Sequence, residues 1–486
     1  MKKYFLIIIA FTLFVFSCDL FRSGNYGTKM FWAQNLENDK FYQVRAELLI
    51  SGEYCNVWAE IGSGVDEETA QKIADEYDIN IHEKMMDVFG LEGTQFLHFG
   101  NLIADNTIKL ADWFGDEDGK LCILLLDIKD DYKYKNDAYV AGYFWGGDLL
   151  YDSNHPIYKY SNKRDMIYID TYPGLNNFDN LYRTLSHELQ HLINISISLY
   201  YIFFDDTREG FTDLWIDEGL SSAAEYITYG HSRGRISYYN MNETGLIEKG
   251  NNFFVWNNRY NKTQNENEHP NAVLDDYATV YLFFQWLRIQ NKSMNIYGGI
   301  ISSEYFNYKA VTEAAKAIKP EYSEWGNLLG AWLAANHDYT GEDGYKSDFG
   351  ESEEFAVVKH YAPKGIHSLD LYPGEGVYSY SANKPDYENN ENIVYLYLDK
   401  NRTLITYNKN SDILGNKTKG SVTGLHPPAA NLAGQNIRSA LSFNVPAGPY
   451  PISAGDMRRR RGFAEFPFLI DDLGRVYDLI KQRGNN

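Results

Sequence analysis

Cysteine is scarce in this chain of 486 residues, which contains only 3. Cys55 and Cys122 lie in apolar, strand-like segments, and neither has a second Cys or a His at ligand spacing, so we expect neither to bind a metal. A core of this size does not need a disulfide, which makes two buried thiols the simplest interpretation. A Cys55–Cys122 bridge is the alternative, and an oxidising compartment would permit it.

Basic residues are also few, because 45 Lys and Arg stand against 66 Asp and Glu, for a net charge of −21. Phosphate binding requires clustered Lys and Arg, so we expect no nucleic acid among the partners. The one dense basic run is formed by the arginines at 458–461. It lacks a wider patch, which favours a solvated loop over docking to anionic lipid or glycan. The 44% hydrophobic content is ample for a globular core.

The hydrophobic run at the start of the chain is too short for a membrane-spanning helix, which needs roughly 20 residues. Two lysines precede residues 4–16, which are apolar apart from one Thr, as in a signal peptide. Ser17 before Cys18 resembles the bacterial lipoprotein signal, in which the Cys is acylated; Phe16 departs from it, since a small residue is more usual there. We therefore expect a lipid anchor at Cys18 that holds the protein on the bacterial cell envelope, outside the cytoplasm. Simple secretion is the alternative.

Hydrophobic periodicity predicts the α+β class, with a mixed sheet lobe followed by a helical lobe. Strand patterns occur at residues 43–49, 55–61, 121–127, 166–170, 393–398 and 402–407. Helical spacing occurs at residues 66–88, 181–199, 214–229, 277–290, 308–317 and 325–335. The predicted organisation is a signal peptide at 1–17, a tether at 18–30, a mixed sheet lobe at 31–180, a helical lobe at 181–345 and a C-terminal β-rich domain at 346–486.

The segment His-Glu-Leu-Gln-His at residues 187–191 carries the clearest chemistry. Residues four apart share a helix face, so His187 and His191 can present ring nitrogens to one Zn²⁺ ion. The carboxylate of Glu188 would accept a proton from water and pass it to a departing amine, while zinc polarises the peptide carbonyl. The alternative is an amphipathic helix whose histidines are only capped or surface polar residues.

A second segment at residues 214–226 strengthens the metal interpretation. Zinc catalysis uses a third protein ligand, and a helix–loop–helix return would bring Glu218 back across the first helix to complete a His-His-Glu set. Glu225 lies seven residues further on, two turns along the same face, where it could accept a hydrogen bond from a ligand histidine and fix its tautomer. The alternative for Glu218 is a solvated carboxylate at a helix start.

Together these two segments resemble the gluzincin metallopeptidases, in which the third ligand is a Glu on the helix after the His-Glu-x-x-His helix. Trp215 to Leu220 is similar to the Trp-x-x-Glu-Gly segment of the aminopeptidase-N family. Residues 164–170 followed by 184–191 have the order of the hyicolysin-type peptidases, a likeness that extends over about residues 43–336. The resemblance implies thermolysin-like lobes around the zinc site. Because no Gly-Ala-Met-Glu-Asn run precedes His187, an endopeptidase is favoured over an aminopeptidase.

The same resemblance implies two further parts of a site. Gluzincins hold extended peptide along an edge strand, and residues 138–145 occupy that place in chain order; ordinary core is the alternative. A Tyr or His commonly donates to the developing oxyanion, and Tyr277 is the candidate, with Tyr281 as its competitor.

These patterns predict a zinc-dependent metallopeptidase that hydrolyses peptide or protein substrates, with Glu188 as general base and acid. A lipid-anchored binding protein or adhesin that keeps the fold without turnover is the alternative. A zinc hydrolase acting on other substrates is a third possibility. The sequence makes no prediction of the oligomeric state.

Overall fold

The computed structural model describes residues 27–38, 40–90, 119–130, 139–149, 158–201, 210–230, 233–241, 272–338, 374–380, 392–398 and 403–411, with a few positions between these ranges. The predicted signal peptide, the anchor at Cys18 and the arginine run at 458–461 lie outside these residues. Within the described ranges, no helix combines the length and the apolar character needed to cross a membrane.

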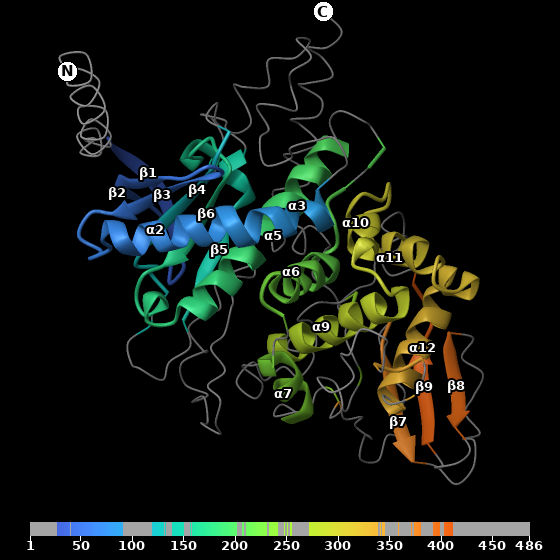
Figure 1. Cartoon of the computed structure of the whole chain (residues 1–486). Coiled ribbons are helices and arrows are strands. Elements are labelled where there is room, and N and C mark those ends of the chain that lie inside the picture. The colour runs from blue at the N-terminus through green and yellow to red at the C-terminus, as the bar shows by residue number, and fades with distance from the viewer. Residues whose placement is uncertain are drawn as a thin grey trace, which may run out of the picture.

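A six-stranded mixed sheet forms the first part of the fold (Figure 1). Its strands are β1 (Thr28–Asn35), β2 (Lys40–Ser51), β3 (Cys55–Glu60), β4 (Leu121–Leu126), β5 (Gly142–Phe144) and β6 (Met166–Asp170). The order is β1-β2-β3-β4-β6-β5, parallel from β3 through β4 to β6 and antiparallel elsewhere. The four strands predicted in this region are confirmed. β1 begins at Thr28, inside the segment predicted as a tether, and pairs along its whole length with β2.

The sheet separates two hydrophobic cores, because successive side chains of a strand point to opposite faces. β4 and β6 are buried throughout, and their residues alternate between a large core under the helices and a smaller core on the other face. Cys55 lies in the large core and Cys122 in the smaller one. The β3–β4 register pairs Asn56, not Cys55, with Cys122, so the two thiols face opposite sides of the sheet. The disulfide alternative is therefore wrong, and two free buried thiols are confirmed.

Helices cover the large-core face and then extend away from the sheet (Figure 1). The helix predicted at 66–88 is present as α2 (Glu67–Glu76), one π-helical stretch (Tyr77–Ile81) and α3 (His82–Phe89). The Asp66 side chain caps its start by accepting a hydrogen bond from the Thr69 N–H at 2.8 Å. α5 (Phe178–Tyr200) packs on β5 and β6, α6 (Leu214–Tyr229) packs on α5, and α9 (Ala272–Asn291) packs on α6.

The remaining described α-helices are α7 (Arg233–Met241), α10 (Asn295–Ile301), α11 (Tyr308–Ala315) and α12 (Trp325–His337). Of these, α7 and α10 pack on α9, α11 packs on α10, and α12 packs on α11 and leads to a second sheet. The second sheet has the antiparallel order β7-β9-β8, from β7 (Gly376–Tyr380), β8 (Ile393–Leu398) and β9 (Thr403–Asn408). β7 and β9 pack on α12, and the Tyr378 hydroxyl donates to the Leu333 carbonyl at 2.5 Å. These strands thus share the large core with the helices; the boundaries of a separate C-terminal domain and the thermolysin-like lobes stay predictions.

The segment after β5 is fixed by a buried carboxylate. Asp148 accepts hydrogen bonds from the Tyr168 hydroxyl at 2.5 Å and from the Asn162 amide at 2.9 Å. Asn162 in turn accepts from the Trp32 N–H at 2.8 Å, which ties the segment to β1. Burial raises the pKa of Asp148 to about 7, although these donors oppose the rise. The end of β5 is therefore held in place from two other strands.

A glycine lets β5 lie directly on α5. A Cβ atom at Gly142 would stand 2.7 Å from the Thr184 side chain and 2.9 Å from the Tyr168 carbonyl oxygen. The second contact is with the backbone of β6, which cannot move aside, so a larger residue here would be pressed toward Thr184 and would disturb the packing of β5 between β6 and α5. Thr184 lies one helical turn before Glu188, and the approach at Gly142 therefore sets the distance between β5 and the predicted general base.

We expect Gly142→Ala to lower the free energy of unfolding by about 2 kcal/mol, because the added methyl overpacks this contact. Urea denaturation followed by circular dichroism measures the change. Gly27→Ala is the matched control, since a Cβ at Gly27 meets no atom within 4 Å. The control should stay within about 0.5 kcal/mol of the wild type. Equal effects of the two substitutions would contradict the close-approach argument.

Candidate metal centre

Two antiparallel helices, α5 and α6, carry the predicted metal ligands. α5 is buried along nearly its whole length from Leu181 onward, so its polar residues lie inside the protein rather than at its surface. α6 is buried from its first turn. Gly219 permits this arrangement on the far side of α6, because a Cβ there would overlap the ring of Phe284 on α9. The surface-histidine interpretation of the motif is therefore wrong.

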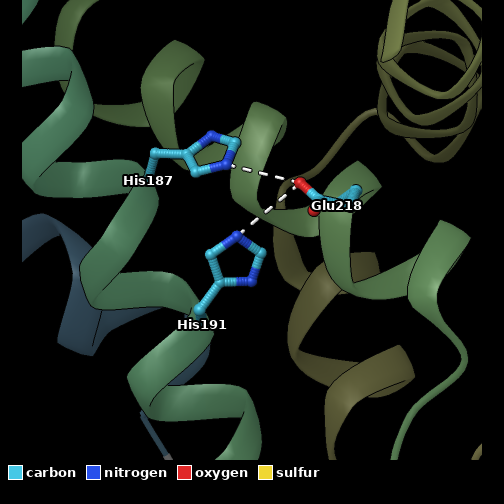
Figure 2. Close-up of side chains that lie close together, drawn as sticks. All are labelled: His187, His191 and Glu218. Carbon is cyan, nitrogen blue, oxygen red and sulfur yellow. Dashed lines mark ion pairs between the residues drawn. The ribbon is translucent and has the colours of Figure 1, made fainter. Parts of the chain in front are cut away.

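The structure brings His187, His191 and Glu218 together (Figure 2). The Glu218 Oε2 atom lies 3.4 Å from His187 Nε2 and 3.6 Å from His191 Nε2. All three residues are at most 2% exposed. Within the described part of the chain, this is the one group of three His, Cys, Asp or Glu side chains arranged to share an ion, with ligand atoms within 4.8 Å of one another.

The three ligand atoms fit a zinc ion in both chemistry and spacing. His187 Nε2, His191 Nε2 and Glu218 Oε2 are buried and make no hydrogen bond in the structure. Buried polar atoms without a partner are costly, and a shared cation would satisfy all three at once. Ligands bound tetrahedrally at about 2.0–2.2 Å lie roughly 3.3–3.6 Å apart, close to the separations of 3.4 and 3.6 Å observed. Two imidazoles and one carboxylate are also the ligand set of zinc sites that keep one position open.

Carboxylates on α6 orient both imidazole rings. His187 Nδ1 lies 2.9 Å from Glu225 Oε1, and His191 Nδ1 lies 2.8 Å from Asp217 Oδ2. The Ser221 hydroxyl lies 3.0 Å from His191 Nδ1. A carboxylate acceptor at Nδ1 places the ring proton there, which leaves the Nε2 lone pair of each ring available to a metal.

The site holds an excess of negative charge. Four acidic residues, Glu188, Asp217, Glu218 and Glu225, are each at most 5% exposed. Burial alone lowers the pKa of His187, but Glu218 and Glu225 outweigh burial and raise that pKa to about 10. The pKa of His191 is also raised, because Asp217 and Glu218 outweigh the effect of its burial. The environment therefore favours an added positive charge, as a divalent cation would provide.

Tyr277 on α9 borders the same cluster. It is 2% exposed, and the pKa of its phenol is raised well above the usual value by burial and then by the Glu218 carboxylate. The Arg235 guanidinium of α7 lies over the Tyr277 ring, 4.7 Å from its centroid, and reaches Glu225 Oε1 at 3.4 Å. Arg235 also holds the pKa of Glu225 low, although burial of that carboxyl acts in the opposite direction. Tyr281 is equally buried one turn further along α9.

Sequence reasoning placed Glu225 beside a ligand histidine, and the structure gives it His187. It missed Asp217, Ser221 and Arg235. The sequence could have identified Asp217. In antiparallel helices, the second histidine of α5 lies opposite an earlier residue of α6, and Asp217 is the carboxylate just before Glu218. Arg235 carried no such signal, since its helix has no motif connecting it to the site.

Comparison with known proteins gives one informative match. No protein-family model matches the chain. A neutral metalloprotease, ShpI of Staphylococcus hyicus, is 31% identical to it over 270 residues, which are 54% of this chain and 51% of that protein. The chain thus matches about half the length of this relative.

Removing the third ligand should abolish stable metal binding. We expect Glu218→Gln to lose zinc after dialysis, because a neutral amide replaces the carboxylate oxygen. Glu225→Gln should retain zinc with about 10–100-fold weaker affinity, since it alters only the partner of His187. Metal analysis measures the zinc content of each variant, and chelator competition measures its zinc affinity. Glu313→Gln, at an exposed salt bridge, is the control. Stronger loss from Glu225→Gln than from Glu218→Gln would exchange the two assignments.

Proposed function

We propose that this protein is a zinc-dependent metallopeptidase of the gluzincin type, acting as an endopeptidase on peptide or protein substrates. The observation that carries the proposal is the convergence of two Nε2 atoms and one carboxylate oxygen, all buried and without hydrogen bonds, in the His-Glu-x-x-His order. The partial match to a neutral metalloprotease supports the same activity. Zinc, when bound, would act as a Lewis acid towards the peptide carbonyl and make water nucleophilic.

Glu188 is the general base and acid in this proposal. Its side chain is fully buried and lies next to His187 on α5, one turn beyond Thr184, which contacts β5. Glu188 and Thr184 are four residues apart, so the carboxylate lies on the face of α5 that Thr184 turns toward β5. It takes the proton of the attacking water and delivers it to the nitrogen of the departing amine.

The β5 strand is the proposed binding edge for extended peptide. The Asp170 N–H donates to the Ala141 carbonyl at 2.9 Å, so this residue pair is a hydrogen-bonded pair of the antiparallel β5–β6 ladder. Such pairs alternate, and the backbone groups of Gly142 and Phe144 therefore point away from β6. A substrate strand would pair with these groups and lie alongside α5. The described β5 (Gly142–Phe144) lies in the second half of the segment predicted at 138–145.

Tyr277 is the proposed donor to the oxyanion that forms during cleavage. Its raised pKa keeps the phenol protonated, and the contribution of the Glu218 carboxylate to that rise supports a position near the proposed metal ligands. A donor fixed at this point stabilises negative charge as it develops on the carbonyl oxygen.

The lipid anchor at Cys18 and the location on the bacterial cell envelope are part of the same proposal. They rest on the signal-like residues 1–18 alone. An anchored peptidase would act on peptides or proteins outside the cytoplasm.

Glu188→Gln should leave zinc bound and lower kcat/KM for peptide cleavage by at least about 10²-fold, because the amide cannot accept the proton. Cleavage of a peptide library, read by mass spectrometry beside metal analysis, measures both quantities. Glu68→Gln, on the exposed face of α2, is the control. Normal cleavage by Glu188→Gln would refute the mechanism. A wild type that binds zinc but cleaves no peptide would point instead to a binding protein or another hydrolase.

Substitutions at two tyrosines one helical turn apart distinguish a role in oxyanion stabilisation from a role in packing. Tyr277→Phe should lower kcat by about 10²-fold with little change in KM or zinc content, because one donor to the transition state is lost. Tyr281→Phe removes a hydroxyl from an equally buried ring on the same helix and should change kcat much less. Steady-state kinetics on one peptide substrate compares them. A larger effect at Tyr281 would reverse the assignment.

A further inference from the structure

A chain of buried polar side chains leads outward from the metal centre, starting at the partner of His191. The Asn194 amide donates to Asp217 Oδ1, while Asp217 Oδ2 faces His191 Nδ1 at 2.8 Å. The Thr212 hydroxyl donates to Asn194 Oδ1 at 2.8 Å. Asn194 is 2% exposed and Thr212 is 6% exposed, so water does not replace these bonds. Both oxygens of Asp217 are thus engaged, one by a ligand histidine and one by Asn194.

The same chain continues to the end of another helix. The hydroxyl oxygens of Ser198 and Thr212 are 3.4 Å apart, and Arg208 Nη1 donates to Ser198 Oγ at 3.1 Å. The Arg208 guanidinium also donates to the carbonyls of Ile301, at 2.5 Å, and of Ser303, at 2.8 Å. Ile301 is the last residue of α10, so a cation lies at the negative end of that helix. The chain therefore joins the metal centre to α10 through the segment between α5 and α6.

The donors in this chain all point toward Asp217. Arg208 can only donate, so Ser198 accepts from it. The single hydroxyl proton of Thr212 goes to Asn194, so Ser198 must donate to Thr212. Hydrogen bonds aligned in one direction polarise one another and strengthen the last acceptor's hold on its donors. The last acceptor here is the Asp217 carboxylate, which therefore has one fixed orientation toward His191.

We propose that Asn194, Thr212 and Ser198 are positioning residues that fix the Asp217 carboxylate and thereby aim His191 Nε2 at the metal. Arg208 ends the chain and anchors it to α10. The inference rests on the proposed function, in which His191 is a zinc ligand. Apolar side chains could fill the same volume, and a buried polar chain is not required for stability. The role of these polar residues is therefore to fix the position of the His191 ring at the metal site.

Thr212→Val tests this role, because it keeps the shape of the side chain and removes the donor to Asn194. We expect about fivefold weaker Zn²⁺ binding, below the roughly 10–100-fold for a direct partner of a ligand, since Thr212 acts through Asn194 and Asp217. Chelator competition with Zn²⁺ gives the affinity. The visible spectrum of the Co²⁺-loaded protein reports the ligand geometry and should change as well. Thr212→Ser restores the hydroxyl and should restore both readouts.

Thr312→Val is the matched control. Thr312 is also buried, and its hydroxyl donates to the Lys309 carbonyl of its own helix, at 3.2 Å. Equal Zn²⁺ affinity and equal Co²⁺ spectra for Thr212→Val and Thr312→Val would overturn the positioning role. If Thr212→Val does not fold, Ser198→Ala gives the same comparison from the other side of Thr212. Failure of the wild-type protein to bind Zn²⁺ would refute the proposed function itself, which is a separate outcome.

Discussion

The structure depends on one arrangement, the antiparallel packing of α5 against α6 with polar side chains inside the contact. Most helix pairs bury apolar side chains where they touch, whereas this pair buries two imidazoles with four carboxylates. Such groups are costly in the interior unless each has a partner. The partners are supplied in order along the pair, with Glu225 opposite His187 and Asp217 opposite His191. This order leaves Glu218 between the two rings.

Small residues make that packing possible on both sides. Gly219 lets α9 approach α6 directly behind the Glu218 ligand, and Gly142 lets the edge strand approach α5 beside Glu188. The mixed sheet contributes its edge strand, β5, which runs antiparallel to β6. Its outward backbone groups lie beside the helix that carries the histidines. The helix pair that carries the candidate site is therefore packed closely on two sides, with the sheet edge against α5 at Gly142 and α9 against α6 at Gly219.

Local patterns carried most of what the sequence could predict. The spacing of His187 and His191 fixes a shared helix face, and the return to Glu218 follows from two adjacent helices. Periodicity located the buried strands and long helices, because their side chains repeat with the period of the backbone. Periodicity could not show whether Cys55 and Cys122 face the same side of the sheet, because that depends on the register between β3 and β4. Contacts made across several elements, such as those of Arg208 and Arg235, have no local pattern at all.

The distribution of positive charge explains why the centre of the helix pair is the place for a cation. Asp217 and Glu218 lie in the first turns of α6, where the helix dipole favours carboxylates. At the other end, Arg235 contacts Glu225 and balances its charge. Between these two ends, Glu218 Oε2 faces two Nε2 lone pairs, because both Nδ1 atoms already face carboxylates. With both ring protons on Nδ1, an acceptor oxygen and two acceptor nitrogens cannot satisfy one another by hydrogen bonding. Without a metal, a second proton on the imidazole takes the place of the cation, which is why the pKa of His187 is raised; a shared divalent ion supplies that positive charge to all three atoms at once.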